Sequence, residues 1–246
     1  DIAIVASSAG ANFSFIPKVE RSSIRPDADY VHICFNNTVY GTKFPYIPDT
    51  GNIPLVADMS SNILAEVTPV ERYAVIYAGA QKNISSAGLT IVIVREDMLE
   101  RSMDICPTML KWKTQADADS LYNTPPTYQI YIAGLVFEHL LSLGGVAEME
   151  KINRYKAGLL YDFIDNSDFY TNSVAKEDRS LMNVPFVTPS KETDAAFVAQ
   201  AAANGLLSLK GHRLVGGMRA SIYNAMPVEG VKALIEFMKK FETENR

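Results

Sequence analysis

The stretch Tyr77-Ala-Gly-Ala-Gln-Lys-Asn83 decides how this sequence is interpreted. It continues an apolar, strand-like segment, Tyr73–Ala80, so Lys82 stands directly after a predicted strand. In open α/β sheets, ligands bind beyond the carboxyl ends of the strands. An isolated lysine at a strand end is usually an ordinary solvated charge. The interpretation of Lys82 therefore depends on what accompanies it.

Two earlier segments end in the same way. Asn52-Ile-Pro-Leu-Val-Ala-Asp58 is a short apolar run that ends in a carboxylate, and Tyr30-Val-His-Ile-Cys-Phe-Asn-Asn-Thr38 is one that ends in a hydroxyl. Short continuous apolar runs are typical of buried parallel strands. Three consecutive strands of this kind would bring Thr38, Asp58 and Lys82 to one crevice.

This set of side chains suits pyridoxal phosphate (PLP), whose ring acts as an electron sink. Lys82 would form a Schiff base with the cofactor and move protons, Asp58 would keep the pyridine nitrogen protonated, and Thr38 would bond the phenolic oxygen. Each residue also has a simpler explanation. Asp58 would suit a helix cap before Met59, and Thr38 a turn before Gly41.

Four longer strings carry a resemblance to a known family. They are Gly79-Ala-Gln-Lys-Asn83, Ala57-Asp-Met-Ser-Ser61, Tyr122-Asn-Thr-Pro-Pro-Thr127 and Gly211-His-Arg-Leu-Val-Gly-Gly-Met-Arg-Ala-Ser-Ile-Tyr-Asn-Ala-Met-Pro227. In this order they resemble the phosphoserine aminotransferase family of class V PLP-dependent enzymes. The resemblance runs nearly end to end.

The resemblance implies a role for each matching residue. Lys82 matches the PLP lysine, Asp58 the partner of the pyridine nitrogen, and Thr38 the hydroxyl beside the ring. Gln81 matches a contact to the cofactor phosphate, and Asn123 and Thr124 match contacts to the cofactor phosphate of a neighbouring subunit. Arg219 matches the arginine that binds the substrate α-carboxylate. His212 and Arg213 match cations near the distal phosphate or carboxylate of the substrate.

The family also implies a fold, a reaction and partners. The fold is the fold-type-I PLP-dependent transferase, α/β, with a mainly parallel central sheet and a smaller α/β C-terminal domain. The reaction is transamination between glutamate and 3-phosphohydroxypyruvate, giving phosphoserine and 2-oxoglutarate in serine biosynthesis, with a possible link to pyridoxine biosynthesis. A homodimer that shares its cofactor sites across subunits is expected.

Bulk properties limit other functions. The chain has 246 residues, 48% apolar and 21% charged, which suits one large or two modest domains. A net charge of −5 argues against nucleic acid as a partner. Cys34 and Cys106 are too few for a disulfide framework, and Cys34 lies in a predicted buried strand, which favours reduced thiols and a cytoplasmic location. His32, His139 and His212 lack metal-ligand spacing, so no metal is expected. No run reaches membrane-spanning length.

Alternation of strands and helices sets the expected architecture. Strands are predicted at Ile2–Ala6, Val31–Phe35, Ile53–Ala57, Tyr73–Ala78, Leu89–Val94 (returning antiparallel), Met182–Val187, Leu206–Leu209 and Met218–Tyr223. Helices are predicted at Thr127–Leu143, Val146–Asn166, Asp194–Ala203 and Pro227–Phe241. The Gly144-Gly145 pair is the expected boundary between the latter part of a large PLP-binding domain, 1–144, and a small C-terminal domain, 145–246.

Some points depart from the family or stay open. The family carries a further N-terminal part before Asp1, with a Gly-rich phosphate turn and a ring-stacking aromatic. Ser85-Ser86 stands where the family has Gly-Pro, which predicts a looser lysine loop. The alternatives are another class V PLP enzyme, such as a cysteine desulfurase relative, and an inactive fragment with only a dimerisation or interaction role. For Asn123-Thr-Pro-Pro126 a helix N-cap competes with phosphate binding, and for Gly216-Gly217 a turn competes with a ligand contact.

Overall fold

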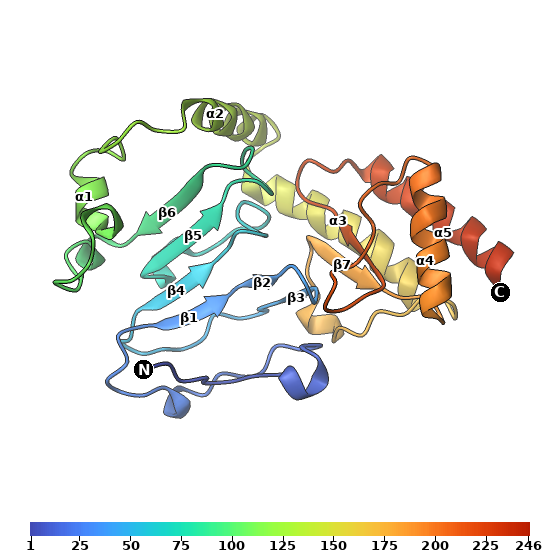
Figure 1. Cartoon of the computed structure of the whole chain (residues 1–246), viewed down its shortest axis with the longest axis horizontal. Helices are drawn as coiled ribbons and strands as arrows, with labels where there is room; N and C mark the ends of the chain where they lie inside the picture. Colours follow the sequence, from blue (N-terminus) through green and yellow to red (C-terminus); the bar gives the residue numbers. More distant parts are fainter.

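The computed structural model describes all residues from Asp1 to Arg246. A sheet occupies one end of the molecule and a helix-rich unit the other (Figure 1). The strands are β1 (Val31–Cys34), β2 (Asn36–Asn37), β3 (Thr42–Lys43), β4 (Leu55–Asp58), β5 (Val75–Gly79), β6 (Thr90–Val94), β7 (Asn183–Phe186) and β8 (Met218–Ser221). The helices are α1 (Trp112–Ala116), α2 (Thr127–Ser142), α3 (Val146–Asp165), α4 (Lys191–Ala203) and α5 (Val228–Asn245).

The main sheet has the strand order β1-β4-β5-β6. β1 pairs with β4 and β4 with β5 in parallel, whereas β6 runs antiparallel to β5. The connection between β5 and β6 is shorter than the dozen or so residues that a parallel crossover needs, so β6 must return antiparallel. The predicted α/β fold with a mainly parallel sheet, and the antiparallel return of Leu89–Val94, are confirmed.

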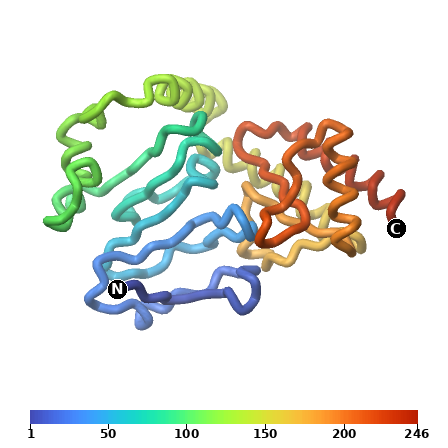
Figure 2. Tube along the Cα trace, in the orientation of Figure 1, coloured from blue at the N-terminus to red at the C-terminus, as the bar shows by residue number.

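The strand predicted at Ile2–Ala6 is wrong. This segment runs beside β1 without joining the sheet (Figure 2). Ile2 is 100% exposed and Ile4 82% exposed. A strand needs a partner for its N–H and C=O groups, and no strand of this chain supplies one for residues 2–6. Apolar composition alone therefore misled the prediction.

The glycine pair after α2 turns the chain sharply. Gly144 and Gly145 have φ of +100° and +81°. Their N–H groups donate to the carbonyls of Leu141 and Leu140 at 3.0 and 2.8 Å, which closes the end of α2 as a Schellman-type cap. α3 then leaves at 83° to α2. No single helix of the chain is long and apolar enough to cross a membrane.

In the C-terminal unit α3 packs against β7 and α5, and α4 packs against α5; all five elements contribute to one buried cluster. Its core contains 19 buried residues drawn from Ala157 to Phe241. β7 and β8 are antiparallel, so the βαβ-like alternation predicted here does not produce a parallel pair. The strand predicted at Leu206–Leu209 is also wrong. Gly205 and Ser208 have positive φ, which breaks the extended backbone, and only an isolated bridge from Lys210 to Met218 remains.

A second core lies under the sheet. Its 14 buried residues are drawn from Ile24 to Ala133, so the two cores use separate parts of the sequence. We propose that the Gly144-Gly145 break divides the chain into two domains, 1–144 and 145–246. Thr38, Asp58, Lys82 and Arg219, which the sequence predicts to be functional, lie near the junction between the two domains.

A pair of glycine substitutions tests the turn between α2 and α3. Gly145 has φ +81° and ψ −168°, a region that is accessible almost only to glycine. A methyl group on Gly145 meets nothing within 4 Å, so Gly145→Ala reports backbone strain alone. We expect the free energy of unfolding in urea to fall by about 1–3 kcal/mol.

Gly158, inside α3, is the matched control. Its added methyl group also meets nothing within 4 Å, but its backbone is helical. Gly158→Ala should raise the free energy of unfolding by about 1 kcal/mol, because alanine has the higher helix propensity. A Gly145→Ala variant as stable as the parent protein would contradict the assigned turn.

Candidate active site

Thr38, Asp58 and Lys82 lie at the carboxyl edge of the parallel strands. Asp58 ends β4, Lys82 follows β5, and Thr38 lies in the turn between β2 and β3. The Lys82 Nζ donates to Thr38 Oγ1 at 2.8 Å. The sequence predicted this convergence because parallel strands end at the same edge of a sheet.

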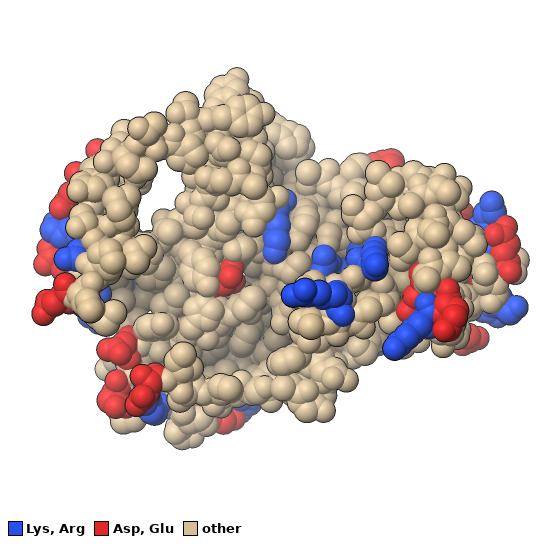
Figure 3. All heavy atoms as spheres, in the orientation of Figure 1, with Lys and Arg blue, Asp and Glu red and all other residues tan.

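The surroundings of Lys82 favour its neutral form. Burial lowers the pKa of the amine, while the charges of Asp58 and Cys34 act in the opposite direction. The Arg219 guanidinium lies close enough to lower the pKa of Lys82 further. Figure 3 shows Lys and Arg side chains gathered in the middle of this face, between the sheet and the C-terminal unit. A neutral amine is a nucleophile, so Lys82 is suited to attack a carbonyl carbon.

Asp58 is fixed by the turn that follows it. The backbone N–H of Ser60 donates to Asp58 Oδ1 at 2.8 Å, and the Ser60 hydroxyl accepts the N–H of Gly79 at 3.1 Å. The simpler explanation of Asp58 as a helix cap is wrong, because no helix begins directly after β4 and the carboxylate instead bonds its own turn. Its charge raises the pKa of the Lys82 amine, so the two groups are close enough to interact.

Gln81 folds back over the end of β5. A Cβ atom on Gly79 would stand 2.6 Å from Gln81 Oε1, so the amide end of Gln81 lies directly over Gly79. The residue is exposed next to Lys82. Its amide is therefore free to contact a ligand.

Arg219 projects from β8 with an unpaired group. Its backbone N–H donates to Leu209 O at 2.8 Å, but its buried Nε has no hydrogen-bond partner. An unpaired buried donor is costly unless a ligand or water satisfies it. A guanidinium that has an unpaired N–H and lies near Lys82 is suited to bind a carboxylate.

His212 and Arg213 lie in the loop before β8. The N–H of Gly211 donates to Gly217 O at 2.8 Å, and a Cβ on Gly211 would stand 2.0 Å from Gly216 O, so glycine permits the loop to close. Gly216 and Gly217 both have positive φ, which confirms the turn. His212 is half-buried and Arg213 exposed, and no hydrogen bond joins either to Lys82.

Asn123 and Thr124 lie apart from the lysine. They belong to the exposed arch that links α1 to α2 (Figure 1). The Asn123 amide donates only to Thr124 O, at 3.2 Å. The alternative role of this segment as an N-cap is wrong, because Pro126 precedes α2 and no side chain caps the helix. Both side chains are open to a neighbouring molecule.

A buried asparagine near Thr38, Asn36, joins the two units, and no sequence motif predicts this role. The Asn36 amide donates to Ser61 Oγ at 2.8 Å and to Asn183 Oδ1 at 3.0 Å. Its Oδ1 accepts the Ser180 hydroxyl at 2.6 Å. Asn36 thus links the turn after Asp58 to β7 of the C-terminal unit.

A second buried asparagine, Asn83, does the same for Lys82. Its amide donates to Ile63 O at 2.9 Å, and its Oδ1 accepts the N–H of Asn224 at 3.0 Å. The Asn224 amide donates to Leu64 O at 2.9 Å and its Oδ1 accepts the Asn153 amide at 2.8 Å. The residue after Lys82 is therefore bonded to the loop that follows β8.

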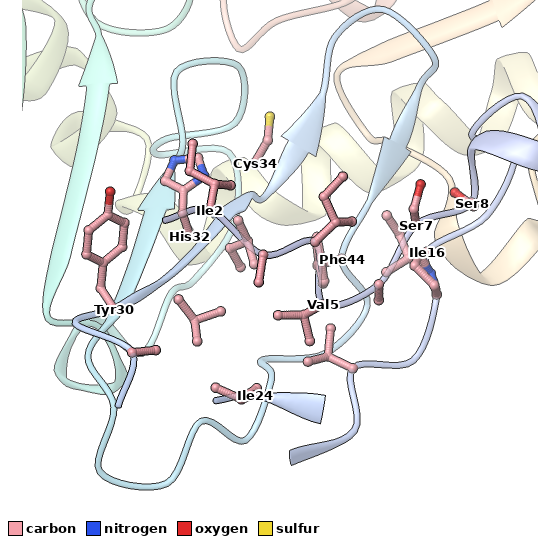
Figure 4. A pocket seen from close by; sticks show the side chains of 18 of the residues that line it. Ile2, Val5, Ser7, Ser8, Ile16, Ile24, Tyr30, His32, Cys34 and Phe44 are labelled. Carbon is pink, nitrogen blue, oxygen red and sulfur yellow. The ribbon is translucent and has the colours of Figure 1, made fainter. Parts of the chain in front are cut away.

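Cys34 is exposed, so its predicted burial is wrong. It lies on the outward-facing side of β1 with Tyr30 and His32 (Figure 4). Although the residue is exposed, protein atoms around the thiol reduce its hydration, and this effect and the charge of Asp58 raise the pKa of the thiol, which makes it a poor nucleophile. A desulfurase-like cysteine on a loop is not found at Cys34. A cavity of about 740 Å³ lies between β1 and the N-terminal residues, but Thr38, Asp58 and Lys82 do not line it.

Ser85 and Ser86 have ordinary backbone geometry, and Ser85 bonds two neighbouring elements. Neither residue has positive φ, so the glycine of the family is not required for backbone geometry here. The Ser85 hydroxyl donates to Gln129 O at 2.7 Å, and its N–H to Ala80 O at 2.8 Å. The loop is thereby tied both to β5 and to α2.

The residues present fit PLP. The half-buried Lys82 amine, whose pKa is lowered, is placed to bond an aldehyde, and it lies against the Thr38 hydroxyl. The charge of Asp58 acts on this amine, and the buried Arg219 Nε has no hydrogen-bond partner. An aldehyde cofactor with a ring nitrogen, and a carboxylate substrate, would use all four groups.

Comparison with known proteins identifies the family. The aminotransferase class-V family model matches residues 9–234. Phosphoserine aminotransferases from Herminiimonas arsenicoxydans and Streptococcus suis are each 57% identical to the chain, with 98% of it covered. The chain spans 67% of the length of each of these two relatives and 66% of a third.

Comparison with solved structures gives the same family. Phosphoserine aminotransferase from Bacillus circulans superposes with a TM-score of 0.95 at 41% identity, covering 99% of this chain and 68% of that one. A PLP-bound phosphoserine aminotransferase from Trichomonas vaginalis superposes with a TM-score of 0.85, also at 41% identity, covering 90% of this chain and 64% of that one. The chain therefore belongs to the class-V aminotransferases, and within them to the phosphoserine aminotransferase family.

Proposed function

We propose that the protein catalyses PLP-dependent transamination between glutamate and 3-phosphohydroxypyruvate, with phosphoserine and 2-oxoglutarate as products. The proposal is carried by the environment of the Lys82 amine. Lys82 Nζ lies 2.8 Å from Thr38 Oγ1, and burial lowers the pKa of this amine near Asp58 and Arg219. The family match over residues 9–234 supports it. Because the chain spans two thirds of its relatives, the activity is proposed for the whole protein.

Bound PLP would supply an electron sink for charge that develops at the substrate Cα. Lys82 would hold the cofactor and then carry a proton to and from Cα, and its burial, which lowers the pKa of the amine, favours that role. Asp58 would face the pyridine nitrogen, and Thr38 would donate to the ring oxygen. Gln81 would bind the cofactor phosphate.

Cations and partner residues complete the proposed site. Arg219 would hold the substrate α-carboxylate, because its buried Nε lacks a partner. His212 and Arg213 would bind the distal phosphate or carboxylate. Asn123 and Thr124 would bind the cofactor phosphate of a second subunit, which implies a two-fold homodimer. Both cysteines are free thiols, which supports a cytoplasmic location.

Lys82→Ala tests the cofactor linkage. Purified protein mixed with PLP should show a visible absorption band, and borohydride reduction should attach the cofactor covalently to the peptide that contains Lys82. Lys82→Ala should abolish both signals, because alanine has no amine. Lys18→Ala, which changes a lysine whose side chain is 80% exposed, should retain both. Covalent labelling at another lysine would contradict the assignment.

Arg219→Lys tests carboxylate binding. Lysine keeps the charge but loses the planar, bidentate fork. We expect kcat/KM for glutamate to fall by about 100-fold, in line with the loss of charge-assisted hydrogen bonds of about 1.5–3 kcal/mol. PLP binding should change little. An unchanged kcat/KM would show that Arg219 does not hold the substrate.

Arg213→Ala tests phosphate recognition. The parent protein should transaminate phosphoserine much faster than serine, and the variant should lose part of that preference because one cation near the distal group is gone. The measurement is the ratio of kcat/KM for phosphoserine to that for serine. Equal rates for both substrates in the parent protein would reject phosphate recognition itself.

A further inference from the structure

His32 and Tyr77 meet across β4 beside Asp58. The His32 Nε2 lies 3.0 Å from the Tyr77 Oη, and the two rings are stacked with centroids 6.0 Å apart. His32 belongs to β1 and Tyr77 to β5, and β4 lies between these strands. The two side chains must therefore reach toward each other over β4.

The strand register places this contact at Asp58. Asp58 pairs with Cys34 on one side and with Tyr77 on the other, and His32 pairs with Val56, two residues earlier on β4. Paired residues of neighbouring strands project from the same face of a sheet. Figure 4 shows His32 and Cys34 standing on one side of β1. The face that carries Asp58 thus carries His32 and Tyr77 as well.

Tyr77 is coupled directly to Asp58. Burial raises the pKa of the Tyr77 phenol, and the charge of Asp58 raises it further. A phenol that remains protonated has one O–H to donate. Among the protein hydrogen bonds, the Asp58 carboxylate accepts only the Ser60 N–H, on Oδ1, so Oδ2 is left for another donor.

We propose that His32 and Tyr77 are positioning residues for Asp58. In the Nε2–H tautomer, His32 donates to the Tyr77 oxygen, which leaves the Tyr77 hydrogen for the Asp58 carboxylate. This chain of donors holds the carboxylate in the orientation that the pyridine nitrogen of PLP requires. The inference rests on the proposed function, because it assumes that Asp58 faces that nitrogen.

Tyr77→Phe separates the hydrogen bond from the ring contact. Phenylalanine preserves the stacking on His32 and removes only the hydroxyl. We expect the dissociation constant of PLP to rise about ten- to a hundredfold, as for one lost hydrogen bond to a charged group. The nitrogen-15 chemical shift of the pyridine nitrogen in bound, labelled PLP should move toward the unprotonated value. Tyr30→Phe makes the same chemical change at the residue just before β1. It should alter neither the PLP dissociation constant nor the nitrogen-15 chemical shift.

Two substitutions of His32 test the first donor in the proposed series of hydrogen bonds from His32 through Tyr77 to Asp58. His32→Gln places an amide N–H near the position of Nε2 and should retain most of the PLP affinity and the parent chemical shift. His32→Phe keeps a ring but has no donor, and it should behave like Tyr77→Phe. If Tyr77→Phe fails to fold, as judged by thermal unfolding without PLP, this second pair carries the test.

The outcomes distinguish the inference from the function on which it rests. If the parent protein binds no PLP, the proposed function fails and the inference fails with it. If the parent protein binds PLP and the folded variants match it in dissociation constant and chemical shift, the positioning role is wrong and the proposed function stands. If His32→Gln and His32→Phe weaken PLP binding equally, an N–H donor at this position does not restore the affinity. That result would also overturn the proposed series of hydrogen-bond donors.

Discussion

Buried asparagine hydrogen bonds between the two units are the interaction on which the site depends. Asn36 lies two residues before Thr38, and Asn83 directly follows Lys82. Asn36 is 2% exposed and Asn83 6% exposed, and both bond partners in the C-terminal unit. Separating the units would leave these amides without partners in an apolar setting, which costs roughly 1–3 kcal/mol for each group. The junction therefore fixes Arg219, on β8, relative to Lys82.

The sequence predicted one half of this arrangement well. Apolar runs that end in Asp58 and before Lys82 predict buried parallel strands, and parallel strands bring their carboxyl ends together. Asn36 could not be found in the same way. Its partner Asn183 is 147 residues distant, and no local periodicity connects them. The strand predicted at Ile2–Ala6 failed for a related reason, since composition indicates an extended segment but not whether a partner strand exists.

Exposed apolar surface on α2 supports the view that more protein covers the sheet unit. Only Ala133 and Leu140 of this helix are buried, while Tyr128 is 65% and Leu141 73% exposed. A helix that is apolar on every side is normally enclosed. The proposed second subunit, or the remaining third of the length of the relatives, would supply such a cover. The exposure of Asn123 and Thr124 just before α2 points to the same face.

The charges around Lys82 connect binding to proton transfer. Arg219 lowers the pKa of the Lys82 amine, whereas Asp58 raises it. A substrate carboxylate on Arg219 would offset the arginine charge and so raise the pKa of Lys82. Lys82 would then accept a proton more readily with substrate present than without it, which is when a base is needed at Cα. The fixed junction makes this coupling possible, because a charge effect of this kind requires Arg219 and Lys82 to keep a constant separation.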